Sequence, residues 1–221
     1  MAAVEDVAGP PPRTAGDSRQ LPRVGDHAVL VPVKAFDHAK TRLTAALGDE
    51  DRKALVRGMA EQVLRAAAPL PVAVVCDDPE VAEWAHGLGA LVLWEPGQGL
   101  NGAVQSGVAQ LTGRGVRRVL VAHADLPMAR DLADLTSFGG VTLVPDRRDD
   151  GTNVIALPTN AGFRFSYGSG SFARHRAECD RLGLAFRVVR EPHLSYDVDW
   201  PSDLSQVALS RVGGRRGQPW P

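Results

Sequence analysis

Short apolar segments alternate with amphipathic helical patterns along most of this chain, and this alternation constrains the fold more than any other feature. The predicted strands are residues 28–33, 72–76, 91–94, 118–122, 141–144, 153–157 and 186–189. The predicted helices are residues 49–67, 79–86, 101–111, 131–135, 171–182 and 202–210. The strands are rich in β-branched residues and almost continuously apolar, as strands buried on both faces are. We therefore predict an α/β fold: a Rossmann-like, doubly wound, mixed but mostly parallel sheet with helices on both faces.

The two ends of the chain lack this alternation. Residues 1–26 contain the run Pro10-Pro11-Pro12 and many small residues, and residues 212–221 are rich in glycine, arginine and proline. Such segments cannot bury enough apolar surface to become ordered. We therefore predict a disordered arm over residues 1–26, one folded domain over residues 27–211 and a disordered tail over residues 212–221.

The composition excludes several classes of protein. Hydrophobic residues make up 44% of the 221 residues, and the net charge of −1 provides no global field to attract nucleic acid or an anionic membrane. The basic residues lie in separate loops without interleaved aromatic residues, which disfavours a nucleic-acid binder. No apolar run has the length of a membrane span or the pattern of a secretory signal. Because Cys76 and Cys179 form no pair motif, a reducing compartment is favoured, and we predict a cytoplasmic protein.

Three aspartates are candidates for a metal site. Asp125 follows the predicted strand 118–122, and Asp197 and Asp199 stand one residue apart near the end of the folded region. In a strand, side chains at positions i and i+2 point to the same face, so the pair can face one spot, where Asp125 can join it. Neighbouring carboxylates repel one another unless a cation lies between them, and Mg²⁺ prefers oxygen ligands and often arrives with phosphates. We favour a magnesium site; the alternative for Asp125 is an aspartate that bonds the following backbone amides of a turn.

The loop after the first predicted strand is basic. It contains Lys34, Lys40 and Arg42 within nine residues, and such side chains suit the oxygens of a triphosphate. The alternative is a solvated basic loop. In doubly wound sheets, ligands bind at the carboxyl ends of the strands near the point where the strand order reverses, and this rule favours the phosphate-binding interpretation.

Three further loops carry glycine. In residues 97–103, Asn101 suits a helix N-cap beside which a base or phosphate could bind, and a plain glycine-rich turn is the alternative. In residues 149–153, the Thr152 hydroxyl and nearby amides could hold a small acid, and a plain turn is again the alternative. In residues 167–172, small residues open a predicted helix, so free N–H groups at its start favour an anion site over a simple N-cap.

Six ordered motifs resemble one family, the 2-phospholactate/phosphoenolpyruvate guanylyltransferases of deazaflavin coenzyme F-420 biosynthesis, which are nucleotidyltransferases with a GT-A-like fold. The motifs are VPVKAFDHAKTRL (31–43), GLNGAV (99–104), HADLP (123–127), DGTNVIAL (150–157), YGSGSF (167–172) and YDVDWPSDL (196–204). They cover nearly the whole folded region. The chain departs from the wider nucleotidyltransferase pattern after the first strand, where Lys34-Ala35-Phe36-Asp37 stands in place of a Gly-x-Gly-x-Arg loop.

The resemblance implies an enzyme that transfers GMP from GTP to phosphoenolpyruvate or 2-phospho-L-lactate and releases pyrophosphate. The residues that it implies are the Mg²⁺ ligands Asp125, Asp197 and Asp199, the acceptor-binding residues Thr152, Gly168 and Ser171, the catalytic and nucleotide-phosphate residues Lys34, Lys40 and Arg42, and Asn101 at the nucleoside. A member that uses phosphoenolpyruvate looks most similar. The acceptor, the number of metal ions and the choice between monomer and homodimer stay open.

Two other classes of protein are alternatives. A GT-A glycosyltransferase, or another nucleotidyltransferase that uses a nucleotide sugar or a sugar phosphate, would also place a metal on an Asp-x-Asp motif. In glycosyltransferases that motif normally follows a strand in the middle of the domain, whereas here it lies near the C-terminal end. A non-catalytic nucleotide-binding module would not need three acidic residues beside two anion sites.

Overall fold

The structure is a computed structural model that describes residues 24–204. The predicted arm (apart from residues 24–26), the predicted tail and most of the predicted helix 202–210 lie outside these residues. The strands are β1 (His27–Pro32), β2 (Val72–Cys76), β3 (Leu91–Trp94), β4 (Arg118–Ala122), β5 (Val141–Pro145), β6 (Thr152–Pro158) and β7 (Phe186–Val188). The α-helices are α1 (Asp49–Ala66), α2 (Pro79–Gly87), α3 (Gly99–Gly113), α4 (Ser171–Leu182) and α5 (Pro192–Ser195). Short 3-10 helices are η1 (Phe36–His38), η2 (Thr41–Leu43), η3 (Leu132–Ser137) and η4 (Pro201–Asp203).

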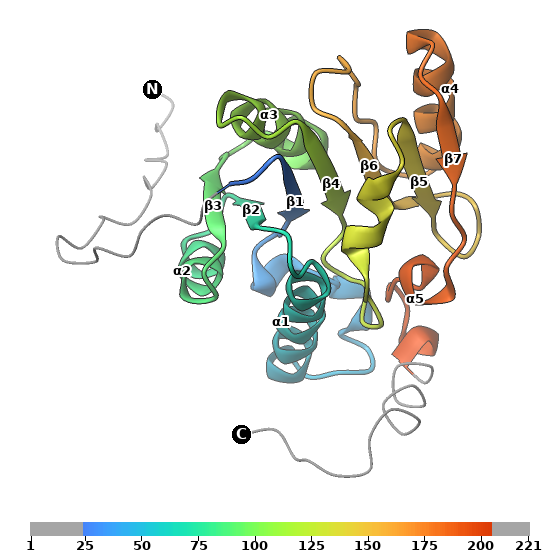
Figure 1. Cartoon of the computed structure of the whole chain (residues 1–221). Coiled ribbons are helices and arrows are strands. Elements are labelled where there is room, and N and C mark those ends of the chain that lie inside the picture. Colours follow the sequence, from blue (N-terminus) through green and yellow to red (C-terminus); the bar gives the residue numbers. More distant parts are fainter. Residues whose placement is uncertain (1–23, 205–221) are drawn as a thin grey trace, which may run out of the picture.

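The strands form one sheet in the order β3-β2-β1-β4-β6-β5-β7 (Figure 1). Strand β6 pairs antiparallel with both β4 and β5, and every other pair is parallel. The predicted mixed, mostly parallel, doubly wound sheet is therefore confirmed. The strand order reverses at β1, because β2 lies on one side of it and β4 on the other. The carboxyl ends of β1 and β4 consequently flank the crevice in which sheets of this kind bind ligands.

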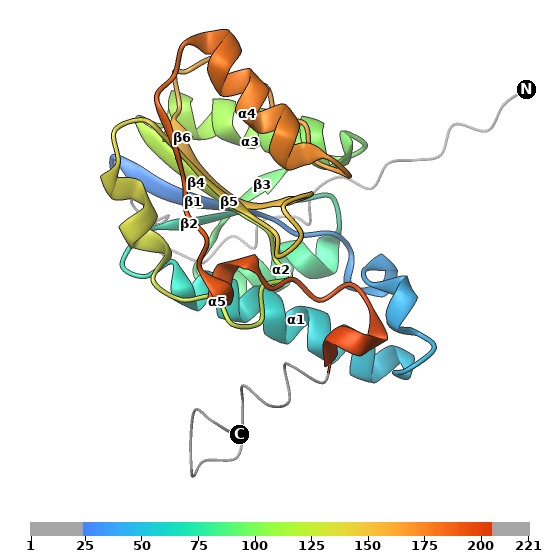
Figure 2. The ribbon, with the colours of Figure 1, turned by 90° about the vertical axis from the view of Figure 1, so that its right-hand side faces the viewer.

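The sheet separates two hydrophobic layers (Figure 2). Along β1, Val29 and Val31 face the layer that contains α1 and α2, while Ala28 and Leu30 face the layer that contains α3. This alternation follows from the two-residue period of a strand. Since both faces are covered by helices, the inner strands are apolar at nearly every position, which is the pattern that the sequence shows.

Several predicted bounds differ from the structure by one residue, and two elements differ by more. Asn101 does not cap α3, because the helix begins at Gly99 and Asn101 lies within its first turn. Gly97 and Gly99 both have positive φ angles, a conformation that glycine adopts without steric cost, and the turn that they form starts the helix earlier than predicted. The segment predicted as helix 131–135 forms the 3-10 helix η3, as short connecting pieces often do.

Candidate active site

Lys40 brings the basic loop into contact with the acidic residues at the centre of the crevice. Its Nζ lies 2.5 Å from Oδ2 of Asp125, which follows β4, and 2.6 Å from Oδ1 of Asp199. The Lys40 side chain is only 14% exposed, while the carboxylates of Asp125 and Asp199 are 22% and 41% exposed. Two of the three predicted aspartates therefore meet, and the group that joins them is a lysine that we predicted to face nucleotide phosphates.

The backbone at Lys40 is held in an unusual conformation. Its φ angle of 55° and ψ angle of 39° lie in the left-handed region, which is costly for a residue with a side chain. The preceding loop is anchored by buried Arg52 of α1, whose Nη1 donates to the carbonyl oxygens of Phe36 at 3.1 Å and Ala39 at 2.6 Å. Phe36 is also buried, with its ring edge against Trp84. The loop is thus fixed on α1, and this anchoring supports the strained residue beside the acids.

The segment 197–199 reaches the site without being a strand. It follows α5 as irregular, extended chain, so the strand geometry that we used to align the two aspartates is not present. Instead, the Val198 amide donates to the backbone carbonyl of Asp125 at 3.3 Å, and the Val198 side chain is fully buried in the core. With Val198 held inside, Asp197 and Asp199 flank it at the edge of the crevice.

Asp203 and Arg147 fix the backbone of the segment 197–200 by hydrogen bonds. The buried Asp203 carboxylate accepts hydrogen bonds from the amides of Asp199 at 2.9 Å and Trp200 at 2.8 Å, and from Arg147 Nη2 at 2.7 Å. Arg147 Nη1 donates to the Asp197 carbonyl at 3.2 Å, and the guanidinium lies 4.6 Å from the centre of the Tyr196 ring. Sequence reasoning did not identify these residues, because nothing in the local pattern indicates that Arg147 reaches residues fifty positions away.

Replacing Arg147 with methionine should lower turnover about tenfold if Asp197 and Asp199 hold a metal as predicted from the sequence, because outer-shell partners of metal ligands typically contribute 10- to 100-fold. The substitution keeps much of the apolar stem but removes the hydrogen bonds to Asp203 and to the Asp197 carbonyl. Steady-state kinetics over a range of Mg²⁺ concentrations would measure the effect, which should include a higher Mg²⁺ requirement. The adjacent, exposed Arg148, replaced in the same way, serves as the control. Activity of Arg147→Met equal to that of Arg148→Met would show that the contact does not position the acids.

The charges at the site are strongly interdependent. Burial raises the pKa of Asp197, and the neighbouring Asp125 and Asp199 carboxylates raise it further, to about 6. For Lys40, burial lowers the pKa, but the carboxylates of Asp125 and Asp199 outweigh this and hold it above its ordinary value. Burial acts to raise the pKa of Asp125, and the Lys40 ammonium outweighs it and lowers that pKa. The Lys40 ammonium thus pairs with the carboxylates of Asp125 and Asp199, and Asp197 lies nearby. The cluster therefore contains more carboxylates than ammonium groups.

One carboxylate oxygen of the cluster is suited to a divalent cation, although the described residues do not form a preassembled metal site. Within residues 24–204, no group of three or more histidine, cysteine, aspartate or glutamate side chains is arranged so that it could hold a metal ion. Oδ1 of Asp125, however, is buried and has no hydrogen-bond partner among the described residues. A buried carboxylate oxygen without a donor is costly unless a ligand completes it. Carboxylate oxygens are also the donors that hard divalent cations prefer.

A second polar cluster joins β6 to the start of α4. Thr152 begins β6, and because β6 runs antiparallel to β4, its first residues lie beside the carboxyl end of β4. Thr152 Oγ1 lies 3.4 Å from Ser171 Oγ and 3.0 Å from Nδ1 of His175, and all three residues are buried. Gly168 is exposed and accepts a hydrogen bond from the Ser171 amide at 3.0 Å. The structure therefore brings Thr152, Gly168 and Ser171 together, as expected.

The start of α4 is less open to an anion than we predicted. The Asp150 carboxylate accepts hydrogen bonds from the Gly170 amide at 3.0 Å and the Ser169 hydroxyl at 3.3 Å, and its backbone carbonyl accepts from the Phe172 amide at 3.0 Å. The prediction that these donors are free is wrong, because Asp150, from the turn before β6, already accepts hydrogen bonds from the residues at the start of α4, where the positive end of the helix dipole favours a carboxylate.

Three predicted residues, Lys34, Arg42 and Asn101, form no hydrogen bond or ion pair, within the described part of the chain, with the side chains of the Lys40 cluster or the Thr152 cluster. Lys34 is exposed, and exposed Arg42 places its guanidinium 4.7 Å from the centre of the Trp200 ring. Asn101 is exposed on α3, where its Oδ1 accepts a hydrogen bond from the Tyr167 amide at 2.6 Å. Asn101 thus links α3 to the loop before α4, a contact that the sequence did not indicate.

Two aromatic residues lie between the clusters and were also missed. The rings of His123 and Tyr167 have centres 4.9 Å apart, and the Tyr167 ring contacts His175 edge-on at 5.0 Å. His123 Nε2 and the Tyr167 hydroxyl are buried and have no partner among the described residues. Burial lowers the pKa of His123 and raises that of Tyr167, so both are neutral near pH 7.

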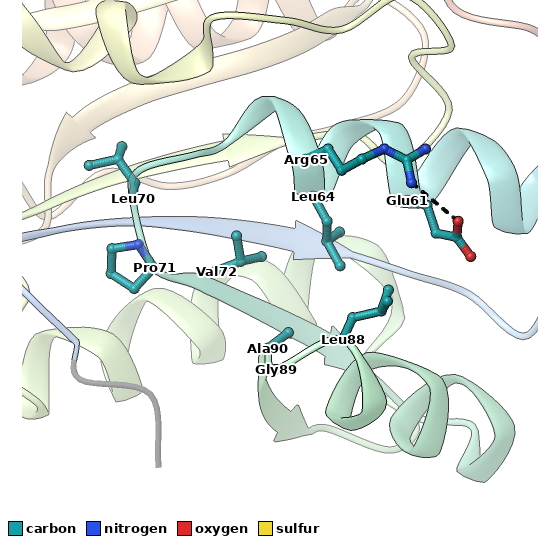
Figure 3. A pocket seen from close by; sticks show the side chains of 9 residues that line it. All are labelled: Glu61, Leu64, Arg65, Leu70, Pro71, Val72, Leu88, Gly89 and Ala90. Carbon is teal, nitrogen blue, oxygen red and sulfur yellow. Dashed lines mark hydrogen bonds and ion pairs between the residues drawn. The ribbon is translucent and has the colours of Figure 1, made fainter. Parts of the chain in front are cut away.

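A separate pocket of about 300 Å³ lies away from this chemistry (Figure 3). It is lined by the end of α1 and by residues around the amino ends of β2 and β3, including Leu70, Val72 and Ala90. These ends lie at the edge of the sheet opposite to the carboxyl ends that carry Lys40 and Asp125. Its only charged lining residues, Glu61 and Arg65, pair with each other. The candidate active site is therefore the cluster around Lys40 and Asp125 at the carboxyl ends of the strands, and not this pocket.

The fold is that of nucleotidyltransferases: an open α/β sheet, which here carries acidic and basic side chains at the carboxyl ends of its strands. A solved nucleotidyl transferase from Methanothermobacter thermautotrophicus has the same fold: its TM-score is 0.60 at 16% sequence identity, and the match covers 86% of this chain and 99% of that one. Residues 27–215 match the family described as "Guanylyl transferase CofC like", and the chain belongs to this family. The resemblance inferred from the sequence motifs is thus confirmed.

Two relatives illustrate the range of the family. The phosphoenolpyruvate guanylyltransferase of Sphaerobacter thermophilus is 38% identical over 188 residues, which cover 81% of this chain and 91% of the relative. The 2-phospho-L-lactate guanylyltransferase of Methanothermobacter thermautotrophicus is 33% identical over 193 residues, which cover 83% of this chain and 85% of the relative.

Among the described residues, no helix is both long and apolar enough to cross a membrane.

Proposed function

We propose that this protein is a cytoplasmic phosphoenolpyruvate guanylyltransferase of coenzyme F-420 biosynthesis, acting as a monomer or homodimer and binding neither nucleic acid nor membrane. It would transfer GMP from GTP to phosphoenolpyruvate, with 2-phospho-L-lactate as the alternative acceptor. The observation that carries the proposal is the meeting of Lys40 with Asp125 and Asp199 at the switch point of the sheet, beside the cluster of Thr152 and Ser171.

The proposed nucleotide site uses side-chain cations. Lys34 and Arg42 are exposed on the loop after β1 and can bind the phosphates of GTP, with Arg42 offering a planar fork of donors and Lys34 a mobile point charge. Lys40 would contribute a third cation once its carboxylate partners are neutralised. Asn101, near the start of α3, is the proposed contact to the nucleoside.

The proposed metal ligands are Asp125, Asp197 and Asp199, and the proposed ion is Mg²⁺. When bound, Mg²⁺ would neutralise the negative charge that develops on the transferred phosphoryl group and help to align the attacking and leaving oxygens. The unpartnered Oδ1 of Asp125 and the excess of carboxylates over ammonium groups support this assignment. Arg147 and Asp203 would hold the 197–199 segment so that its oxygens keep their positions.

The proposed reaction is a displacement at the α-phosphorus of GTP. An oxygen of the acceptor phosphate forms a bond to this phosphorus, and the bond from phosphorus to the oxygen that bridges to the β-phosphate breaks, so pyrophosphate leaves. The acceptor needs no general base, because the second pKa of a phosphate monoester is about 6. The barrier is repulsion between two anions, and the remedy is positioning and charge neutralisation by Lys34, Lys40 and Arg42. Thr152, Gly168 and Ser171 would hold the acceptor.

The test is a matrix of substrates with the purified protein and Mg²⁺. Each of GTP, ATP, CTP and UTP is combined with phosphoenolpyruvate, 2-phospho-L-lactate, 3-phosphoglycerate or a sugar phosphate, and pyrophosphate release is measured. We expect the largest rate with GTP and phosphoenolpyruvate. Mass spectrometry should then find one product that contains GMP joined to the acceptor through a diphosphate. Release that is fastest with a sugar phosphate, or no release with any pair, would overturn the proposal.

A further inference from the structure

His175 is a buried titratable residue for which the proposed reaction has no use. It lies on α4, it is fully buried, and both of its ring nitrogens have partners. Nε2 lies 2.9 Å from the backbone nitrogen of Ser166, and Nδ1 lies 3.0 Å from Oγ1 of Thr152. The imidazole therefore connects the loop before α4 to the first residue of β6.

These partners determine where the imidazole carries its hydrogen. A backbone amide can only donate, so Nε2 must accept the hydrogen bond from Ser166 and cannot carry a hydrogen itself. The hydrogen of a neutral ring must then be on Nδ1. Burial, together with the charges of Arg174 and His123, lowers the pKa of His175 to about 4, which is consistent with a neutral ring near pH 7.

The hydrogen on Nδ1 in turn directs the Thr152 hydroxyl. Because Nδ1 donates to Oγ1, the hydroxyl hydrogen of Thr152 cannot be donated back to the ring and must find another acceptor. Thr152 is buried, and its hydroxyl hydrogen has no acceptor among the described residues. Ser171 Oγ, at 3.4 Å, is a weak donor to Thr152 Oγ1 and does not take this hydrogen.

We propose that His175 is a positioning residue for the acceptor: by donating to Thr152, it leaves the hydroxyl hydrogen of Thr152 available to the phosphate of phosphoenolpyruvate. The inference rests on the proposed function, in which Thr152 and Ser171 hold the acceptor. His175 acts through Thr152 and does not touch the substrate. Its effect is therefore confined to acceptor binding and does not extend to the nucleotide.

The test compares variants that keep or remove the donor. His175→Phe keeps an aromatic ring but cannot donate, and we expect it to raise the KM for phosphoenolpyruvate about 3- to 10-fold, the range that one hydrogen bond commonly provides. The KM for GTP should change less than twofold. His175→Asn places an amide donor near the position of Nδ1 and should recover most of the loss.

A double-mutant cycle tests whether His175 changes the KM for phosphoenolpyruvate through Thr152. Thr152→Val should raise the KM for phosphoenolpyruvate by itself, and adding His175→Phe to it should change that KM by less than twofold. Cys179→Ala, at a fully buried residue on the same helix, is the control for a general loosening of α4. We expect this control to lower the melting temperature without separating the two KM values.

Several results would overturn the inference. They are multiplicative effects of the Thr152 and His175 substitutions, an equal rise in both KM values, or a loss in His175→Asn as large as in His175→Phe. If His175→Phe does not fold, His175→Leu, which also cannot donate, replaces it in the comparison with His175→Asn and in the cycle with Thr152→Val. Failure of the proposed function looks different, because the unmodified protein itself would then release no pyrophosphate with phosphoenolpyruvate.

Discussion

Replacing Asp197 with asparagine should lower turnover with GTP, phosphoenolpyruvate and Mg²⁺ by at least about 100-fold. Removing an outer-shell partner of a metal ligand already costs 10- to 100-fold, and Asp197 is a proposed direct ligand. The fold should survive, because the ion pairs of Lys40 are with Asp125 and Asp199 and not with Asp197. The melting temperature without added metal should not fall, since the change removes one of three neighbouring negative charges.

The measurement is initial rates of pyrophosphate release beside thermal melts of the same preparations, with Mg²⁺ binding followed by calorimetry. Asp134→Asn, at an exposed aspartate of η3, removes the same charge away from the crevice and is the matched control. Turnover within threefold of the control would reject Asp197 as a metal ligand. A large fall in melting temperature would show instead that Asp197 is needed for folding.

Replacing Lys40 with methionine should have the second largest effect, and it should act on both stability and activity. The ammonium contacts two carboxylates, so removing it leaves negative charges close together without their counter-ion. Breaking a fully buried pair costs about 3–5 kcal/mol. Because the Asp199 carboxylate is 41% exposed and therefore partly screened by water, we expect about 2 kcal/mol, which is a fall of roughly 5 °C in melting temperature.

Added Mg²⁺ should restore much of this loss. A divalent cation can neutralise the same carboxylates, and a ligand that binds only the folded state stabilises it. The rise in melting temperature with Mg²⁺ should therefore be larger in Lys40→Met than in the unmodified protein. Turnover should nevertheless stay about 100-fold low at saturating Mg²⁺, because the cation proposed to face the triphosphate is missing, and losses of this size follow removal of a single group that stabilises the transition state.

Lys53→Met is the control for this experiment. Lys53 also pairs with two acidic residues, Asp37 and Glu50, but the side chains of these residues are 54% and 92% exposed. Its loss should change melting temperature and turnover little, as is usual for exposed ion pairs. An equal response of Lys40→Met and the unmodified protein to Mg²⁺ would show that the ammonium and the metal do not share these carboxylates.

Much of the fold was predictable because its pattern is local. Strands β2, β3 and β4 and helix α4 have the predicted bounds, since each is a short apolar run or a period-3.6 pattern ended by glycine, proline or a polar turn. The boundaries of α3 differ more, and its start depends on Gly97 and Gly99, whose positive φ angles cannot be read from hydrophobic periodicity. The carboxyl-end rule also selected the loops that meet in the crevice.

The sequence by itself determined the class of fold, the loops around the site and the residue types available there, because hydrophobic periodicity and glycine placement act over a few neighbouring residues. Only the tertiary structure decided which side chains meet. Lys40 joins Asp125 and Asp199 across separations of 85 and 159 residues, and His175 reaches Thr152 across 23. Such contacts follow from strand order and from the packing of irregular segments such as 197–199. Since a hydrogen bond needs partners within about 3 Å, no local pattern can predict which distant groups will form it.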